Sequence, residues 1–425
     1  MNSIRTRDSA VIWHPYTQMK HWPEAIGIVR GEGVYLVDEA GNRYIDAISS
    51  WWVNLHGHAH PYIAAQLSQQ LYQLEHCIFA GFTHEPAVRL AERLLPLLPG
   101  AMVRIFYSDN GSTAVEVAIK MAWQYHQQTG SGKTKLVALE GAYHGDTFGA
   151  MSVSGRSLFT DRFAPLLFDA AFIPFPGEDN EAACLAAFDA LLEAGDVAAI
   201  ILEPLIQGSA GMRMYPPAVL EQLMQRARQQ GCLVIADEVM TGFGRTGTLF
   251  ACDQVQAAGP DIVCLSKGLT GGTLPLGVTA CSQDIFDAFL GDEAHRTLYH
   301  GHSFTANPIA CMAGNASLDL LLDPVCQENI QQIGQAHARA RLRWQDHKRI
   351  KSVRQHGTIL AIELDTGSGT GYLNEQRDFI YRFFLERGIL MRPLGNIIYI
   401  LPPYCITLPE LDLIYRQIDA LLETI

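Results

Sequence analysis

The sequence lacks the features that mark secreted and membrane-spanning proteins. It contains no uncharged apolar run of the roughly 18 residues that cross a membrane, and charges are scattered through residues 1–16, where a signal peptide would have an apolar core. The nine cysteines are odd in number, include no C-x-x-C pair and mostly lie inside apolar runs. Such cysteines are typical of a reducing compartment, so we expect a cytoplasmic protein with no membrane contact.

Basic residues are scarce as well. The chain has 31 Lys and Arg residues against 44 Asp and Glu residues, a formal net charge of −13, and no basic run. The resulting negative potential opposes nucleic-acid binding, so we expect small-molecule partners. The alternating histidines His56, His58 and His60 lack the cysteines or carboxylates that would complete a metal site, and we predict no metal.

The order of the apolar segments predicts an α/β fold. With 425 residues, 48% of them apolar, the chain can bury a large core. From about residue 61, helical patterns alternate with short apolar runs that read as strands of a mainly parallel sheet, at residues 103–108, 135–140, 170–175, 198–204, 232–236 and 262–265. After about residue 320, charged amphipathic helices alternate with strands, which is typical of a smaller α+β domain.

These patterns predict two domains. Residues 33–47 read as a strand pair joined by a turn at residues 40–42. We assign the N-terminal segment, residues 1–55, to the small domain, residues 56–320 to the large domain, and residues 321–425 to the rest of the small domain.

Two of the predicted strands end in charged residues. The run 232–236 is followed by Asp237, and the run 262–265 is followed by Ser266 and Lys267. Parallel strands covered on both faces place ligand sites beyond their carboxyl ends, so Asp237 and Lys267 should share one edge of the sheet. A desolvated lysine attacks aldehydes, and a carboxylate one strand away can keep a pyridine nitrogen protonated.

A third candidate lies at residues 108–113, SDNGST, which end one strand and open a helix. Thr113 and Glu116 have the spacing of a capping box, Gly111 permits close backbone approach, and the free N–H groups of the first turn attract an anion such as phosphate. A capped helix without a ligand is the alternative. Together with Asp237 and Lys267, this segment supplies the parts that pyridoxal phosphate (PLP) needs.

Two glycine-rich segments suggest nucleotide binding, but neither has the right context. Residues 130–134 end like a P-loop, yet the required earlier glycine is Gln127 and the segment runs from helix to strand. Residues 242–247 match G-x-G-x-x-G, but Asp261 precedes its strand, whereas the acidic residue of a dinucleotide fold closes the next strand. A nucleotide-binding oxidoreductase is therefore the less favoured class.

The segments around the paired charges resemble the class III (omega) aminotransferases of PLP-dependent transferase fold type I. Residues 237–247 and 265–268 carry the closest likeness, and the resemblance covers nearly the whole chain. Further matching segments are SDNGSTAVEVAIKMA (108–122), GAYHGDTFGAMSVSG (141–155), ILEPLIQGSAGM (201–212) and HGHSFTANPIACMAG (300–314). The resemblance implies a large domain with a mainly parallel sheet, a smaller α+β domain and PLP as cofactor.

The resemblance also implies residue roles. Lys267 would hold the aldehyde of PLP and move the proton during transamination, Asp237 would pair with the pyridinium nitrogen, and Tyr143 would stack on the ring. Gly111 and Ser112 would bind the phosphate. Ser303, where many relatives carry threonine, would reach the phosphate of the neighbouring subunit, so the functional unit would be a homodimer with shared active sites.

Residues 13–19, 49–58 and 391–399 resemble the biotin-pathway branch of this family. That branch transfers an amino group to 8-amino-7-oxononanoate, a long apolar chain ending in a carboxylate, usually from S-adenosylmethionine and in some members from lysine. Tyr16, Trp51 and Trp52 would supply an uncharged aromatic wall, and Arg392 would bind the distant carboxylate. Paired tryptophans that merely pack in the core are the alternative.

Two further assignments leave alternatives open. Arg245 is a second candidate for contact with the substrate, but it would equally hold its loop by pairing with Glu203 or Asp237. Gly301 is expected at the substrate. Within the family, an omega-aminotransferase acting on a diamine, ornithine or γ-aminobutyrate is the alternative function.

Overall fold

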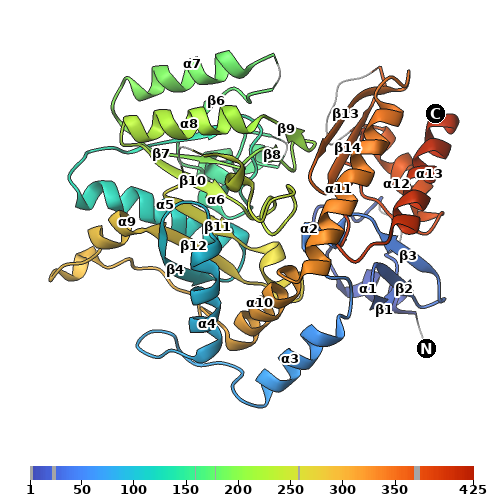
Figure 1. Cartoon of the computed structure of the whole chain (residues 1–425), viewed down its shortest axis with the longest axis horizontal. Helices are drawn as coiled ribbons and strands as arrows, with labels where there is room; N and C mark the ends of the chain where they lie inside the picture. Colours follow the sequence, from blue (N-terminus) through green and yellow to red (C-terminus); the bar gives the residue numbers. More distant parts are fainter. Residues whose placement is uncertain (1–2, 22–24, 158, 178, 257–258, 368–373) are drawn as a thin grey trace.

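A seven-stranded sheet lies at the centre of the larger part of the chain (Figure 1). In the computed structural model, which describes residues 3–21, 25–157, 159–177, 179–256, 259–367 and 374–425, the strand order is β4-β12-β11-β10-β7-β5-β6. The strands are β4 (Met102–Ser108), β5 (Lys135–Leu139), β6 (Ala171–Ile173), β7 (Val197–Leu202), β10 (Leu233–Asp237), β11 (Ile262–Leu265) and β12 (Gly277–Ser282). The six apolar runs predicted as strands all lie in this sheet.

Strand direction agrees with the predicted, mainly parallel sheet. β10 pairs in parallel with β7 and β11, and β5 pairs in parallel with β7 and β6. β12 is not among the predicted strands and runs antiparallel to its neighbours β4 and β11. It follows β11 through a glycine-containing loop without a crossover helix, so the alternation of helices and strands does not mark it.

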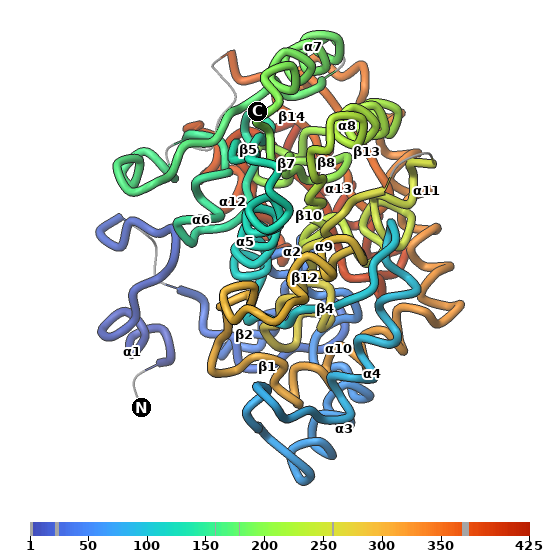
Figure 2. The backbone as a smooth tube through the Cα atoms, turned by 90° about the vertical axis from the view of Figure 1, so that its left-hand side faces the viewer, coloured from blue at the N-terminus to red at the C-terminus, as the bar shows by residue number. Residues whose placement is uncertain are grey.

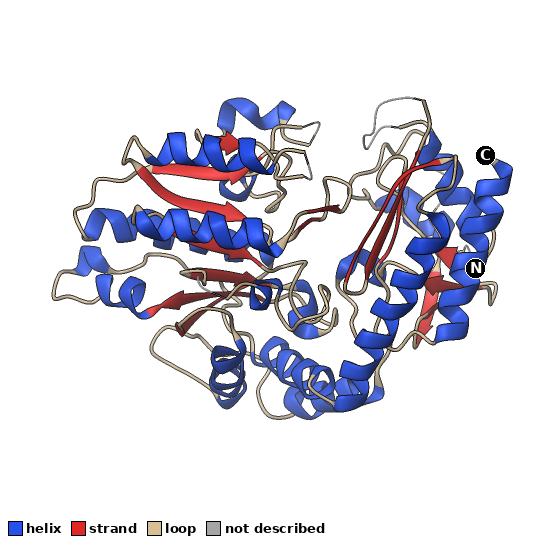
Figure 3. Ribbon diagram, turned by 45° about the horizontal axis from the view of Figure 1, so that its top comes forward, coloured by secondary structure: helices blue, strands red, loops and turns tan. Residues whose placement is uncertain are grey.

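Helices cover both faces of this sheet (Figure 3). In β7, Ile201 belongs to the core shared with α5 (Gly111–Gln128), whereas Leu202 belongs to the core shared with α7 (Glu181–Leu192) and α8 (Pro217–Gln229). Every residue of β7 is buried. Burial from both sides explains why these strands are continuously apolar instead of alternating.

The two ends of the chain share a second sheet, β1-β2-β3-β15. The predicted strand pair is present as β2 (Tyr35–Asp38) and β3 (Arg43–Asp46); β1 (Ile28–Glu32) pairs with β2, and β15 (Ile389–Leu390) pairs in parallel with β3. Figure 1 shows these strands beside the C-terminal helices. The domain boundaries at residues 55/56 and 320/321 stay a prediction.

A third, antiparallel sheet completes the C-terminal part. It consists of β13 (Ile350–His356), β14 (Ile359–Leu364) and β16 (Ile397–Ile400). The surrounding helices are α11 (Pro324–Trp344), α12 (Gln376–Leu385) and α13 (Leu408–Thr424).

Shorter elements connect these sheets. Figure 2 shows α1 (Ile4–Val11) at the margin of the molecule, and none of its residues is buried. The others are α2 (Ser49–Trp52), α3 (Pro61–Leu71), α4 (Glu85–Leu94), α6 (Phe148–Ser152), β8 (Ile206–Gln207), β9 (Arg213–Met214), α9 (Gln283–Ala288) and α10 (Pro308–Leu321). Within the described ranges no single helix has the length and apolar composition to cross a membrane; only α10 and α11 taken together, bent by 70°, meet that criterion.

Candidate active site

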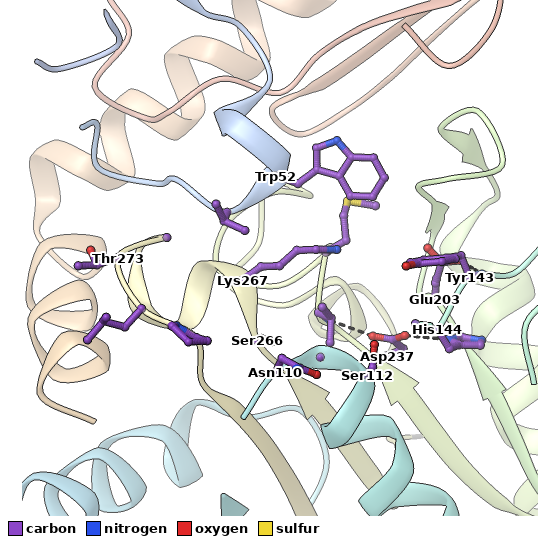
Figure 4. A pocket seen from close by; sticks show the side chains of 18 residues that line it. Trp52, Asn110, Ser112, Tyr143, His144, Glu203, Asp237, Ser266, Lys267 and Thr273 are labelled. Carbon is purple, nitrogen blue, oxygen red and sulfur yellow. Dashed lines mark hydrogen bonds and ion pairs between the residues drawn. The ribbon is translucent and has the colours of Figure 1, made fainter. Parts of the chain in front are cut away.

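The carboxyl ends of β10 and β11 open on a cavity of about 420 Å³ (Figure 4). Asp237 closes β10 and pairs in register with Cys264 of β11, and Lys267 follows two residues after β11 ends. Both Asp237 and Lys267 line the cavity. The prediction that they share one edge of the sheet is confirmed, and their chemical roles stay predictions.

The Lys267 amine lies in a partly desolvated position. Its Nζ is 4.8 Å from the centre of the Trp52 ring, and Figure 4 shows the side chain extending across the cavity beneath that ring. Burial lowers the pKa of Lys267, the carboxylates of Asp237 and Glu203 oppose this effect, and Arg245 adds to it. A lysine with a lowered pKa holds more of the neutral, nucleophilic form.

Asp237 is held by two hydrogen bonds at the floor of the cavity. Nδ1 of His144 lies 2.7 Å from Oδ2 of Asp237, and the Val239 N–H donates to Oδ1 at 3.1 Å. Asp237 and His144 are both buried, and Nε2 of His144 has no hydrogen-bond partner among the described residues. Sequence reasoning gave His144 no role, although it directly follows Tyr143 and a buried carboxylate needs a partner.

Glu203 is a second buried carboxyl group of the cavity. It follows β7, and it accepts hydrogen bonds from the N–H groups of Tyr143 at 3.0 Å and Gly208 at 2.9 Å. Burial raises the pKa of Glu203 to about 7; Asp237 raises it further and His144 lowers it. Sequence reasoning considered Glu203 only as a partner of Arg245, although the strand-end rule that found Asp237 also applies to β7.

The start of α5 forms another wall of the cavity. Asn110 and Thr113 make the capping box, so the predicted box of Thr113 and Glu116 is wrong. The backbone of Asn110 is extended and the helix begins at Gly111, one turn before Glu116, whose carboxylate instead accepts the N–H groups of Gly149 and Ala150. Asn110, which caps the start of α5, therefore also lines the cavity.

Glycine is required where this helix meets the cavity. A Cβ on Gly111 would lie 2.8 Å from Val239, and a Cβ on Gly145, whose φ is +131°, would lie 2.1 Å from Oγ of Ser112. The Ser112 Oγ also accepts the Asp146 N–H at 3.2 Å. The first turn of α5 thus faces the cavity closely and offers an anion its free N–H groups.

These groups fit PLP. Around one cavity the chain presents a desolvated amine, a buried carboxylate and a helix N-terminus whose Gly111 leaves no room for a side chain. Lys267 would hold the aldehyde, Asp237 the pyridine nitrogen, and Gly111 and Ser112 the phosphate. Tyr143 lines the same cavity, as the predicted ring contact requires.

Three of the predicted substrate residues meet beside the cavity. The Tyr16 ring packs edge-on against Trp51 at 5.7 Å, and the guanidinium of Arg392 lies 5.0 Å from the centre of the Trp51 ring. The Tyr16 hydroxyl lies 3.4 Å from that of Tyr143 and donates to Asp146. A second cavity of about 220 Å³ shares Tyr143 and Gly145 with the first, and is also lined by Asp146, Phe159, Gly211, Leu394 and Ile397.

Trp52 points away from this cluster. Its indole N–H donates to the Tyr399 hydroxyl at 3.0 Å, and its ring faces Lys267. Trp52 is buried, whereas Trp51 is 43% exposed. The two neighbouring tryptophans therefore serve different sides of the site, and only Trp52 is part of the core.

Arg245, Gly301 and Ser303 lie outside the main cavity as the described residues form it. Arg245 is buried and donates to the carbonyl groups of Pro402 at 2.8 Å and Asn54 at 3.0 Å. It holds its loop, as the alternative expected, but through partners other than Glu203 and Asp237.

Gly301 and Ser303 lie in an exposed segment before α10. Nδ1 of His302 lies 3.4 Å from Asp109, which ties this segment to the start of α5. The expected contact of Ser303 with a neighbouring subunit, and of Gly301 with substrate, stay predictions.

The alternative site types find no geometric support in the described residues. Residues 242–247 form turns and open no helix, and Asp261 precedes β11 and accepts the Val234 N–H at 2.8 Å, which differs from a dinucleotide fold. His56 contacts Ser317, and His58 contacts Asp46. Across the described ranges, no group of three or more His, Cys, Asp or Glu residues is placed to hold a metal ion.

Comparison with known proteins identifies the family. The model of the family Aminotransferase class-III matches residues 16–422. The adenosylmethionine-8-amino-7-oxononanoate aminotransferase of Synechococcus elongatus is 50% identical over 97% of this chain and 99% of its own. The crystal structure of the protein of the same name from Methanocaldococcus jannaschii superposes with a TM-score of 0.92 at 38% identity, over 98% of each chain.

A further solved structure supports the fold. The omega transaminase of Pseudomonas jessenii, in complex with PMP, superposes with a TM-score of 0.91 at 26% identity, over 100% of this chain and 98% of its own. The predicted α/β fold of PLP-dependent transferase type I is confirmed. The chain belongs to the class-III aminotransferases.

Proposed function

We propose that this chain is a PLP-dependent transaminase of biotin biosynthesis, which converts 8-amino-7-oxononanoate to 7,8-diaminononanoate with S-adenosylmethionine as amino donor. The observation that carries the reaction type is the cavity where the Lys267 amine, the Asp237 carboxylate and the start of α5 meet. Relatives up to 50% identical over nearly the whole chain bear the name of this activity, which supports the choice of substrate. PLP, when bound, takes the amino group from the donor and gives it to the acceptor, so the two substrates react in turn.

The chain's own residues then have distinct tasks. Nζ of Lys267 would hold the aldehyde of PLP and, when released from it, would carry a proton between the substrate carbon that bears the amino group and C4′ of the cofactor. Asp237, oriented by His144, keeps the pyridine nitrogen protonated. The N–H groups at the start of α5, with Ser112, bind the phosphate.

The substrate side has the character that a long apolar acceptor requires. Tyr16 and Trp51 present an aromatic surface without formal charge, and Arg392 lies against Trp51 with its guanidinium available for a carboxylate.

We include in the proposal a homodimer with shared active sites, located in the cytoplasm. Tyr299 and Phe304 are 72% and 63% exposed on the segment that carries Ser303, as expected of a surface covered by a second copy. The nine cysteines are all free, which suits a reducing compartment. Sedimentation of the purified protein should give the mass of two chains.

A donor panel tests the proposal. The PLP-loaded protein is mixed with S-adenosylmethionine, lysine, ornithine, γ-aminobutyrate, a short diamine or alanine in single-turnover amounts, and the absorbance of the lysine-bound cofactor is followed. We expect S-adenosylmethionine to bleach it, and 8-amino-7-oxononanoate to restore it. If ornithine, γ-aminobutyrate or a diamine bleaches it and 8-amino-7-oxononanoate does not restore it, another omega-aminotransferase activity replaces this one, as the likeness to an omega transaminase at 26% identity would allow.

A further inference from the structure

The turn that carries both tryptophans has a strained backbone. Within α2, Ser49, Ser50 and Trp52 have φ values of +52°, +60° and +65°. Residues with a Cβ rarely adopt such values, because each costs energy and persists only where the surroundings impose it. Ser50, at ψ −83°, and Trp51, at φ −130° and ψ 56°, are both non-helical. Something outside the turn must therefore hold it.

The buried carboxylate of Asp46 is the group that holds this turn. Its Oδ1 accepts the N–H groups of Ile48 at 3.3 Å and Ser50 at 2.8 Å. Its Oδ2 accepts the Ser50 hydroxyl at 2.8 Å and Nε2 of His58 at 3.0 Å. Asp46 has no exposed surface, so a lost acceptor here would leave a buried donor without a partner.

The hydrogen bonds of His58 select one tautomer of its neutral ring. The Gly57 N–H donates to Oδ1 of Asn54 at 2.7 Å, which orients the amide so that its nitrogen faces Nδ1 of His58 at 3.2 Å. An amide nitrogen only donates, so Nδ1 accepts and the ring proton sits on Nε2, directed at Asp46. The backbone N–H of His58 also donates to the carbonyl of Gly33 at 2.7 Å, which ties the backbone of this residue to the chain directly after β1.

The strand register brings this carboxylate to the substrate side. Asp46 ends β3 and pairs with Leu390 at the end of the parallel strand β15, two residues before Arg392. Since the carboxyl ends of parallel strands lie together, the turn after β3 and the chain after β15 leave the sheet side by side. The contact of Arg392 with Trp51 is the result.

We propose that Asp46 and His58 are positioning residues for the aromatic wall. They force the turn into its left-handed conformation, so that Trp51 faces Tyr16 and Arg392 while Trp52 faces Lys267. Trp52 has a second support in Tyr399, whereas the contacts of Trp51 among the described residues include the exposed ring of Tyr16 and the guanidinium of Arg392. Loss of the pair should therefore displace Trp51 more than Trp52. The consequence for substrate binding rests on the proposed function; the placement of the rings does not.

Fluorine NMR of the apoprotein, with 5-fluorotryptophan at its six tryptophans, tests the placement directly. Trp51→Phe and Trp52→Phe identify the two resonances. In Asp46→Asn and His58→Ala we expect the Trp51 resonance to shift strongly and that of Trp52 weakly, while Trp344 stays in place. His58→Gln keeps an N–H donor toward Asp46 and should restore the wild-type position of Trp51.

The chain offers a matched control in the same hairpin. Asp38 also accepts four hydrogen bonds, from the N–H groups of Ala40 and Asn42, the Asn42 amide and the Tyr44 hydroxyl, but at the opposite end of β2 and β3. Asp38→Asn should leave the Trp51 resonance and the activity unchanged. An unmoved Trp51 resonance in both Asp46→Asn and His58→Ala, or an equal shift in Asp38→Asn, overturns the proposal.

Kinetics separate positioning from general loss of structure. We expect kcat/KM for the long acceptor to fall about 10- to 100-fold in Asp46→Asn and His58→Ala, mainly through KM, with recovery in His58→Gln. A fall in kcat alone contradicts the proposal. If Asp46→Asn does not fold, His58→Ala against His58→Gln decides it. If the wild type shows no turnover of 8-amino-7-oxononanoate, the proposed function fails while the NMR result still stands.

Discussion

The two sides of the site are built in opposite ways. On the cofactor side, Asp237 ends β10, while Glu203 and Lys267 follow the neighbouring strands β7 and β11, and Asp237 is only 4% exposed. On the substrate side, Tyr16 and Arg392 come from opposite ends of the chain, and Tyr16 and Trp51 are 39% and 43% exposed. The first side relies on desolvated charge held in a rigid sheet, and the second on exposed rings held by long-range contacts.

This difference predicts that the two sides fail differently when they are altered. Changes to the desolvated charges should abolish chemistry, because a buried group acts at one fixed position. Changes to the exposed rings should weaken binding of one substrate and spare the other half-reaction. The following variants test this separation in order of expected effect.

The largest effect is expected from Lys267→Ala. The variant loses the nucleophile and the proton carrier together, so turnover should fall at least about 10⁴-fold although the protein still folds. The measurements are steady-state turnover and the visible spectrum after addition of PLP, which should lack the band of a lysine-bound cofactor. Lys267→Arg is the control, because it keeps a cation beneath Trp52 but cannot bind the aldehyde. Retained turnover in either variant would contradict the role assigned to Lys267.

Asp237→Asn should have the next largest effect. The amide keeps the shape of the carboxylate but loses its charge, and a hydrogen bond to a charged group contributes about 1.5 to 3 kcal/mol, or roughly 10- to 100-fold in rate. We expect kcat to fall by that factor for both half-reactions, with weaker PLP binding by the apoprotein. His144→Gln tests orientation without loss of the charge and should cost less; equal losses in the two variants would mean that His144 does more than orient Asp237.

The substrate side should respond selectively. Arg392→Ala is expected to raise KM for 8-amino-7-oxononanoate about 10- to 100-fold, because a bidentate carboxylate contact is lost, with little change in kcat. Trp51→Ala should have a smaller effect in the same direction. The donor half-reaction, measured by bleaching of the cofactor absorbance, serves as the internal control. If both variants leave the acceptor reaction intact, the assigned substrate is wrong, and a loss of both half-reactions would contradict the separation of the two sides.

The same contrast explains what the sequence could predict. Asp237 and Lys267 were predictable because a buried parallel strand is continuously apolar and its carboxyl end is marked by the next charged residue. The same rule places Glu203, which directly follows the buried strand β7, at this edge of the sheet. β12 was missed since an antiparallel strand needs no crossover helix.

For the substrate side, the sequence predicts which residue types are present but not where their side chains point. Nothing local in the sequence shows that Trp51 and Trp52 point in opposite directions, since this depends on left-handed residues held by Asp46 and on the pairing of β3 with β15. Arg245 illustrates the same limit, because its burial against the carbonyls of Asn54 and Pro402 depends on segments far from it in sequence.

The smallest expected effect concerns the buried carboxyl group of Glu203 and the pH dependence of stability that it causes. Burial raises the pKa of Glu203 from 4.5 to about 7, so between these values the folded apoprotein binds a proton more tightly than the unfolded chain. The stability from this group is full below pH 4.5 and is lost as the pH rises through 7. Glu203→Gln should remove that loss, an effect of at most about 3 kcal/mol.

The measurement is the difference in melting temperature of the apoprotein between about pH 5.5 and about pH 8, compared between Glu203→Gln and wild type. Burial lowers the pKa of His56 and of His337 to about 3, so these groups act in the opposite sense, but they are the same in both proteins and cancel in the comparison. Glu238, whose pKa burial also raises to about 7, lies outside the residues that line the cavity within the described ranges. Binding of PLP should therefore change the contribution of Glu203 to the pH dependence of stability and leave the contribution of Glu238 unchanged. An identical pH dependence in Glu203→Gln and wild type would show that burial does not raise the pKa of Glu203, and the contrast between the two sides would then rest on geometry alone.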